Sequence, residues 1–292
     1  MSINIYEIVT NEIIKGLEKG EVAWQKPWKG GVRPRNFKSM KPYNGINVLM
    51  LALSGGSTPY FLTYKQVQDM GGSVKAGAAS TIIIHWNFSK KIDPVSGEEI
   101  QGTPFLRYFR VFNLDQTVGI EYSNPYEQIA DFEKIHRCEE ILAGFKDMPI
   151  LTHDGQKAFY SNLEDRINMP DPKSFIDEER YYATLFHECV HATRHEKRLN
   201  REKGGDEEAY SKEELVAEIG AAMLNTIAGV EVKTFNNSVA YIQSWLQALR
   251  NDKRMILSAA AQAQKAVDYI HCESGEEVDA PVETNTQEFA AV

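Results

Sequence analysis

The sequence predicts an α+β protein with two domains, and three observations lead to this prediction. An H-E-x-x-H pentapeptide at residues 187–191 lies within a segment of helical periodicity. A second helical segment downstream carries acidic residues one turn apart. The first part of the chain instead mixes helical patterns with β-branched and aromatic runs, which is typical of α+β domains. With 292 residues, the chain is long enough for two hydrophobic cores.

The expected boundaries follow from shifts in composition. We expect an N-terminal α+β domain at residues 1–120, a linker at 121–132, and a mostly helical domain with a small sheet at 133–271. The last residues, 272–292, contain six acidic side chains and no basic one. Such a composition cannot bury enough apolar surface to fold, so we expect a disordered acidic tail.

The elements of the first domain follow from periodicity. Apolar residues at helical spacing predict helices at 6–19, 47–53 and 63–70. A β-branched run at 80–86 predicts one strand, and alternating aromatic, apolar and basic residues at 105–113 predict another. The polar stretch 93–103 between these strands predicts the tip of a hairpin.

The second domain is predicted to be richer in helix. A helix at 133–144 opens it, and three short strands follow at 150–152, 157–160 and 166–169. The remaining apolar periodicities predict helices at 178–195, 211–224, 239–249 and 254–270. A strand beside the H-E-x-x-H helix would offer an edge on which an extended peptide could pair.

The H-E-x-x-H pentapeptide indicates a metal site. Residues four apart on a helix project from the same face, so His187 and His191 can hold one Zn²⁺ together. Glu188 is then placed to act on the water at the metal. The plainer interpretation is a chance pair of surface histidines. A chance match would also need to fall on a helix and be followed by a suitable third ligand.

The downstream helix supplies candidates for that third ligand. Glu214 and Glu218 are one turn apart and are flanked by Leu, Val, Ile and Ala, so we expect both carboxylates to be buried. Buried carboxylates are costly unless they meet a cation. A structural alternative exists for Glu214, because Ser211 and Glu214 together form a capping-box pattern. We expect the neighbouring Glu213 to face solvent.

The two histidines and the two acids one turn apart have a spacing that resembles that of the gluzincin metallopeptidases. These four residues are His187, His191, Glu214 and Glu218. The resemblance implies that Glu214 is the third metal ligand and that Glu218 orients a ligand histidine. The reverse assignment of the two acids remains open. Tyr181, Tyr182 and Tyr210 are unranked candidates for stabilising the oxyanion of a peptide-hydrolysis reaction. The sequence does not distinguish zinc from manganese or another divalent ion.

Composition and charge narrow the class of protein. No run of about 18 apolar residues is found, so we expect no membrane partner. Only three cysteines occur, which favours a reducing compartment and a cytoplasmic location. The net charge is −9, but residues 1–125 hold 14 basic against 10 acidic side chains. This asymmetry points to contact between the first domain and a polyanion.

Aromatic and basic residues are interleaved early in the chain, as in proteins that stack single-stranded bases beside a positive groove. The predicted DNA-binding residues are Trp24, Lys26, Trp28, Lys29, Arg33, Arg35, Lys38, Lys41 and Tyr43. The alternative is that the two tryptophans belong to the core and the cations form a solvated rim. The pattern alone does not decide between these interpretations.

Longer motifs resemble the ArdC family of antirestriction proteins. In the first half they are E-x-G-x-x-x-W-x-x-P-W at 18–28, Y-x-G-I-N-V at 43–48 and T-Y-K-Q at 63–66. In the second half they are the H-E-x-x-H, E-E-L-V-A-E-I at 213–219 and W-L-x-x-L-x-x-D-K-R at 245–254. The resemblance extends in order over residues 4–271.

This resemblance implies that the two domains have different functions. The first domain would bind single-stranded DNA, and the second would be a zinc-metallopeptidase-like domain. The setting would be a plasmid or phage whose incoming DNA is protected from restriction. The protein substrate is not identified, although host restriction machinery is a candidate. In the competing interpretation, the protein binds DNA without catalysis and the metal is structural.

Overall fold

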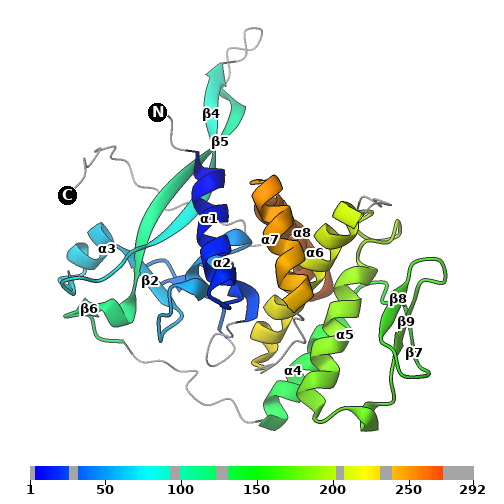
Figure 1. The fold of residues 1–292 in the computed structure, drawn as a ribbon. Coiled ribbons are helices and arrows are strands. Elements are labelled where there is room, and N and C mark those ends of the chain that lie inside the picture. Colours follow the sequence, from blue (N-terminus) through cyan, green and yellow to red (C-terminus); the bar gives the residue numbers. More distant parts are fainter. Residues whose placement is uncertain are drawn as a thin grey trace.

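A computed structural model describes residues 4–25, 32–92, 99–122, 131–201, 207–230 and 239–271. It confirms the predicted α+β class, with one part built on a sheet and the other mostly helical (Figure 1). The predicted acidic tail at 272–292 and residues 93–98 of the hairpin tip predicted at 93–103 lie outside the described residues. Residues 99–103, also predicted as part of the tip, belong instead to a strand. Within the described ranges, no helix is long and apolar enough to cross a membrane.

The N-terminal part is a twisted four-stranded sheet with helices α1 (Ile5–Glu18), α2 (Ile46–Leu53) and α3 (Tyr64–Asp69). The strand order is β1-β2-β5-β4, and the strands are Arg35–Asn36, Tyr60–Thr63, Glu99–Asn113 and Thr81–Ile92, respectively. β1 pairs in parallel with β2, and the other pairs are antiparallel. The long β4–β5 hairpin extends beyond α1 (Figure 1).

Short elements complete this part of the chain. The 3-10 turn η1 (Ala23–Gln25) follows α1, and η3 (Leu114–Gln116) follows β5. Strands β3 (Ser73–Val74) and β6 (Thr117–Val118) form a separate antiparallel pair. Helix α3 begins at a capping box in which the Thr63 hydroxyl accepts from the Gln66 backbone, and the Gln66 side chain accepts from Thr63.

Within the residues that the structure describes, the C-terminal part contains five helices and a three-stranded sheet. The helices are α4 (Asp131–Gly144), α5 (Glu178–Ala192), α6 (Glu207–Ala228), α7 (Val239–Asn251) and α8 (Met255–His271). The sheet has the order β7-β9-β8, with strands Ile150–His153, Arg166–Met169 and Phe159–Ser161; the 3-10 turn η4 (Pro172–Ser174) follows it. β8 is thus an edge strand, and it packs against α5.

Two sequence predictions about helix ends are wrong. Helix α5 ends at Ala192 rather than at residue 195. Helix α6 begins at Glu207, one turn before the predicted start, so Ser211 lies inside the helix and not at its N-cap. The predicted capping box of Ser211 and Glu214 therefore does not form, because interior backbone N–H groups already have helical partners.

The two halves share one hydrophobic core. Trp24 of η1 and Trp245 of α7 are almost fully buried, and their rings meet edge to face at 5.3 Å. The Thr10 hydroxyl on α1 donates to the Lys253 carbonyl at 2.7 Å, and the Gln264 side chain on α8 accepts from the Gly45 backbone at 3.0 Å. The domain boundaries at 120 and 133 remain a sequence prediction, because buried contacts cross them.

Removal of the indole at Trp245 tests this shared core. The Trp245→Ala variant should lose about 3–5 kcal/mol of unfolding free energy, because its ring fills the junction between the halves. Denaturant unfolding followed by circular dichroism measures the loss. Trp86→Ala is the matched control. Because Trp86 is 48% exposed, its removal should lower the unfolding free energy much less. Equal losses of unfolding free energy in the two variants would contradict the assignment of Trp245 to a core that both halves share.

Candidate functional site

Two crossing helices carry the predicted metal ligands. Asp177 is the N-cap of helix α5, and its carboxylate accepts a hydrogen bond from the backbone N–H of Arg180. Its apolar face is buried, which leaves His187 and His191 side by side on the face toward α6. A Cβ at Gly220 of α6 would lie 2.8 Å from the Val190 side chain, so only glycine permits this close approach of the helices.

Three donor atoms converge between the helices. The Nε2 atoms of His187 and His191 are 3.0 Å apart. The Glu214 carboxylate lies 3.6 Å from the first nitrogen and 3.5 Å from the second. Ligands about 2.0–2.1 Å from a tetrahedral zinc are separated by roughly 3.3 Å. The donor set therefore fits a single divalent cation, and among the described residues this is the one such group of His, Cys, Asp and Glu side chains.

Glu213 is buried, so the prediction that it faces solvent is wrong. Only 12% of its side chain is exposed. Its Oε1 atom lies 3.2 Å from His191 Nδ1 and accepts a hydrogen bond from Arg201 Nη2 at 2.6 Å. Burial alone would raise the pKa of Glu213, but His191 and Arg201 hold it below its ordinary value. Glu213 thus fixes the orientation of the His191 imidazole, a candidate metal ligand.

Glu218 lies on the outer side of the other imidazole. Its Oε1 atom is 4.0 Å from His187 Nδ1, and its Oε2 atom is buried without a hydrogen-bond partner. Burial raises the pKa of this carboxyl group. This position supports the assignment of Glu214 as the inner acid and Glu218 as the outer one, and it disfavours the reverse order.

Glu188 is buried between the two histidines and the three-stranded sheet. Its side chain is 7% exposed and accepts a hydrogen bond from the Tyr160 backbone of β8. Burial raises the pKa of Glu188, while the neighbouring imidazoles oppose this change. A carboxylate with an elevated pKa is better suited to accept a proton near neutral pH.

Arg198 holds the edge strand against the end of α5. Its Nε donates to the Ala192 carbonyl at 2.7 Å, and its Nη2 donates to the Tyr160 hydroxyl at 3.1 Å. It also forms an ion pair with Asp165. Burial opposes ionisation of Asp165, but Arg198 and Tyr160 lower its pKa to about 2. This network fixes the edge strand β8 relative to the candidate metal ligands.

The three candidate tyrosines can now be ranked. The Tyr182 hydroxyl bonds to Glu139 on α4, and the Tyr181 hydroxyl lies 2.9 Å from His153 Nε2, so both are engaged elsewhere. Tyr210 on α6 hydrogen-bonds to Glu214 and has 58% of its surface exposed. It is the tyrosine next to the donor cluster.

The predicted DNA-binding residues that the structure describes differ in their exposure to solvent. Lys26, Trp28 and Lys29 lie outside the described residues. Trp24 is in the core, so its ring cannot stack on a base, and its assignment to the DNA surface is wrong. Arg33, Arg35 and Tyr43 are half-buried, and Tyr43 packs on Phe61. Lys38 and Lys41 are exposed.

Aromatic residues exposed on the β4–β5 hairpin were not among the predicted binding residues. Trp86, Phe105 and Tyr108 are 48%, 38% and 37% exposed. Trp86, Tyr108 and the exposed Arg110 lie on one face of the hairpin, and Phe105 and the exposed Arg107 lie on the other. The alternating pattern at 105–113 predicted the strand correctly. It did not reveal which of the large side chains would remain uncovered.

Comparisons with known families agree with this arrangement. Residues 3–112 match the family described as the N-terminal domain of anti-restriction factor ArdC. Residues 137–262 match the family of zincin-like metallopeptidases. The chain is 32% identical to an uncharacterized protein, y4eC, of Sinorhizobium fredii, covering 94% of this chain and 93% of that protein.

Other similar proteins include a primase and solved structures. The chain is 33% identical to the DNA primase TraC of Escherichia coli, over 91% of this chain but 27% of the primase. Crystal structures of the antirestriction ArdC protein from the R388 plasmid, metal-free and Mn(II)-bound, are 37% and 36% identical. Both have a TM-score of 0.76 and cover 92% of this chain and 97% of that chain.

These findings confirm the predicted cofactor class. The match to a zincin-like domain implies zinc, and a solved structure of the R388 protein contains Mn(II).

The Glu213→Gln variant tests the orienting role of this acid. Loss of its charge should weaken Zn²⁺ binding about 10- to 100-fold, because outer hydrogen bonds fix the ligand imidazole and raise its basicity. Competition with a chromophoric chelator measures the affinity. The exposed Glu7→Gln variant is the control. Unchanged affinity in a folded Glu213→Gln protein would show that Glu213 only stabilises Arg201.

Proposed function

Because the chain belongs to the ArdC family of antirestriction proteins, we propose that it protects the single-stranded DNA of a plasmid or phage and carries a metal-dependent peptidase. The observation that carries the peptidase proposal is the convergence of three donor atoms from two helices. The protective role is supported by the R388 antirestriction relative, which aligns with almost the whole chain.

In this proposal each residue at the donor cluster has a separate task. His187, His191 and Glu214 hold the cation, and Glu213 and Glu218 orient the two imidazoles. When bound, the cation lowers the pKa of water and polarises a carbonyl oxygen. Glu188 accepts the proton of the attacking water and passes it to the leaving amine.

Two further features of the chain support peptide hydrolysis. The edge strand β8 packs beside α5 and can pair with an extended substrate backbone. The exposed Tyr210 hydroxyl hydrogen-bonds to Glu214, and once Glu214 holds the cation this hydroxyl can donate instead to the oxyanion that develops on the attacked carbonyl.

Binding of single-stranded DNA is proposed for the N-terminal half. It is supported by the basic balance of residues 1–125 and by the match of this half to the ArdC N-terminal family. A DNA primase also contains a region similar to this chain. No recognition helix is predicted for reading a duplex, whereas the hairpin exposes aromatic rings that suit unpaired bases.

The Glu188→Gln variant tests the peptidase. Hydrolysis of a quenched fluorescent peptide library should fall about 10²- to 10⁴-fold, because the general base is lost, while metal content stays at the wild-type level. Tyr210→Phe should lower the rate about 10²- to 10³-fold without loss of metal. Glu178→Gln, on the outer start of α5, is the control.

The outcomes separate the two candidate roles of the metal. Equal hydrolysis by wild type and Glu188→Gln would remove Glu188 from the mechanism. If no peptide is cleaved and Glu188→Gln still protects DNA from restriction, the metal is structural and the protein acts by binding.

DNA preference is tested by competition. A labelled oligothymidylate should be displaced by unlabelled single strands at much lower concentrations than by duplex of equal length. The logarithm of the binding constant should fall linearly with the logarithm of salt concentration, by about 0.7 for each phosphate contact. Equal competition by duplex would contradict the proposed preference.

A further inference from the structure

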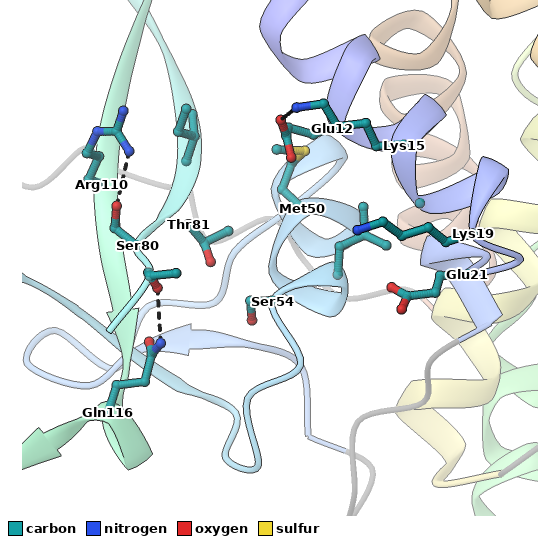
Figure 2. A pocket seen from close by; sticks show the side chains of 14 residues that line it. Glu12, Lys15, Lys19, Glu21, Met50, Ser54, Ser80, Thr81, Arg110 and Gln116 are labelled. Atoms are coloured by element: carbon teal, nitrogen blue, oxygen red, sulfur yellow. Dashed lines mark hydrogen bonds and ion pairs between the residues drawn. The ribbon is translucent and has the colours of Figure 1, made fainter. Parts of the chain in front are cut away.

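A cleft opens between helices α1 and α2 and the base of the β4–β5 hairpin (Figure 2). Its volume is about 480 Å³, which is in the range of sites for small ligands. The apolar lining comes from Met50, Leu53 and Ile82, and the hydroxyl groups come from Ser54, Ser80 and Thr81. The cleft therefore offers both an apolar surface and hydrogen-bond donors.

The cations that line the cleft are not all neutralised. Lys15 pairs with Glu12 at 2.7 Å. Arg110 instead donates to the uncharged Ser80 hydroxyl at 3.1 Å, and in the described parts of the chain neither Arg110 nor Lys19 pairs with a carboxylate. Although Glu12 and Glu21 also line the cleft, three cations face two acids. An anionic group is thus favoured beside Lys19 and Arg110.

The sheet register connects this cleft to the exposed rings. Successive side chains of a strand alternate between faces, so Arg110 and Tyr108 of β5 share one face. Ile82 pairs with Arg110, Ile84 with Tyr108, and Trp86 with Leu106, which places Trp86 on that face as well. Leu106, the partner of Trp86, lies four residues from Arg110 along β5, which corresponds to roughly 13 Å.

We propose that a single DNA strand lies along this face, with phosphate groups near Lys19 and Arg110 on the two opposite walls of the cleft and with bases on Tyr108 and Trp86. This inference rests on the proposed binding of single-stranded DNA and assigns its location. Exposed rings can accept any base by stacking, and neighbouring cations neutralise the backbone. The arrangement replaces the sequence-predicted surface, where Trp24 is buried.

Binding titrations of the full-length protein with labelled oligothymidylate test this location. Trp86→Ala should bind about 5- to 150-fold more weakly, which corresponds to 1–3 kcal/mol for one stacked base. Lys19→Ala and Arg110→Gln should each lower the salt slope by about 0.7, because one phosphate contact is lost. Arg110→Lys should keep the slope of the wild type, because the positive charge remains.

Two exposed residues provide matched controls in the same domain. Lys65→Ala removes a cation of α3, and Phe105→Ala removes a ring from the opposite face of the hairpin, so both variants should bind like the wild type. Melting temperatures near that of the wild type would verify that the variants are folded.

The outcomes distinguish this inference from the proposed function. If the wild type binds single strands and the cleft variants bind equally well with the same slope, the location is wrong and the function stands. If the Lys65→Ala and Phe105→Ala controls bind single strands as weakly as the cleft variants, the location is also wrong. If the wild type binds no single strand, both are overturned.

Discussion

The close crossing of helices α5 and α6 is the constraint on which the candidate metal site depends. Two ligands come from one helix and the third from the other, so a small change in their separation would pull the donors apart. The absence of a side chain at Gly220 permits this separation, because Val190 occupies the space that a Cβ would need. Arg201 and Glu213 then fix the orientation of an imidazole across the crossing.

Local periodicity predicted the residues that share one helical face. His187 and His191 were predictable because four residues make about one turn, and the amphipathic pattern of the second helix predicted that Glu214 and Glu218 would be buried. Only the resemblance to the gluzincins named Glu214 as the ligand. The role of Glu213 was not predictable in the same way. Its burial depends on the angle at which α6 crosses α5 and on the loop that brings Arg201 to it. Neither is encoded in the spacing of neighbouring residues.

The same limit applies to the aromatic residues of the first half. The pattern around Trp24 was compatible with a binding surface or a core, and its contact with Trp245, far along the chain, decides for the core. Conversely, the strand at 105–113 was predicted, but the exposure of Tyr108 depends on how far α1 and α2 cover the sheet. Fold class and the metal-binding motif were thus readable from sequence, whereas solvent exposure required the tertiary arrangement.

The tryptophan pair at the junction has an evolutionary consequence. Each half presents apolar surface that the other covers, so separating them would leave both with an exposed, aggregation-prone face. Transfer between genes should then favour the whole unit over either part. The similarity to TraC fits this expectation, since it spans nearly all of the present chain within a much longer primase. Fusion partners would accordingly be added at the ends of this unit and not inserted between its halves.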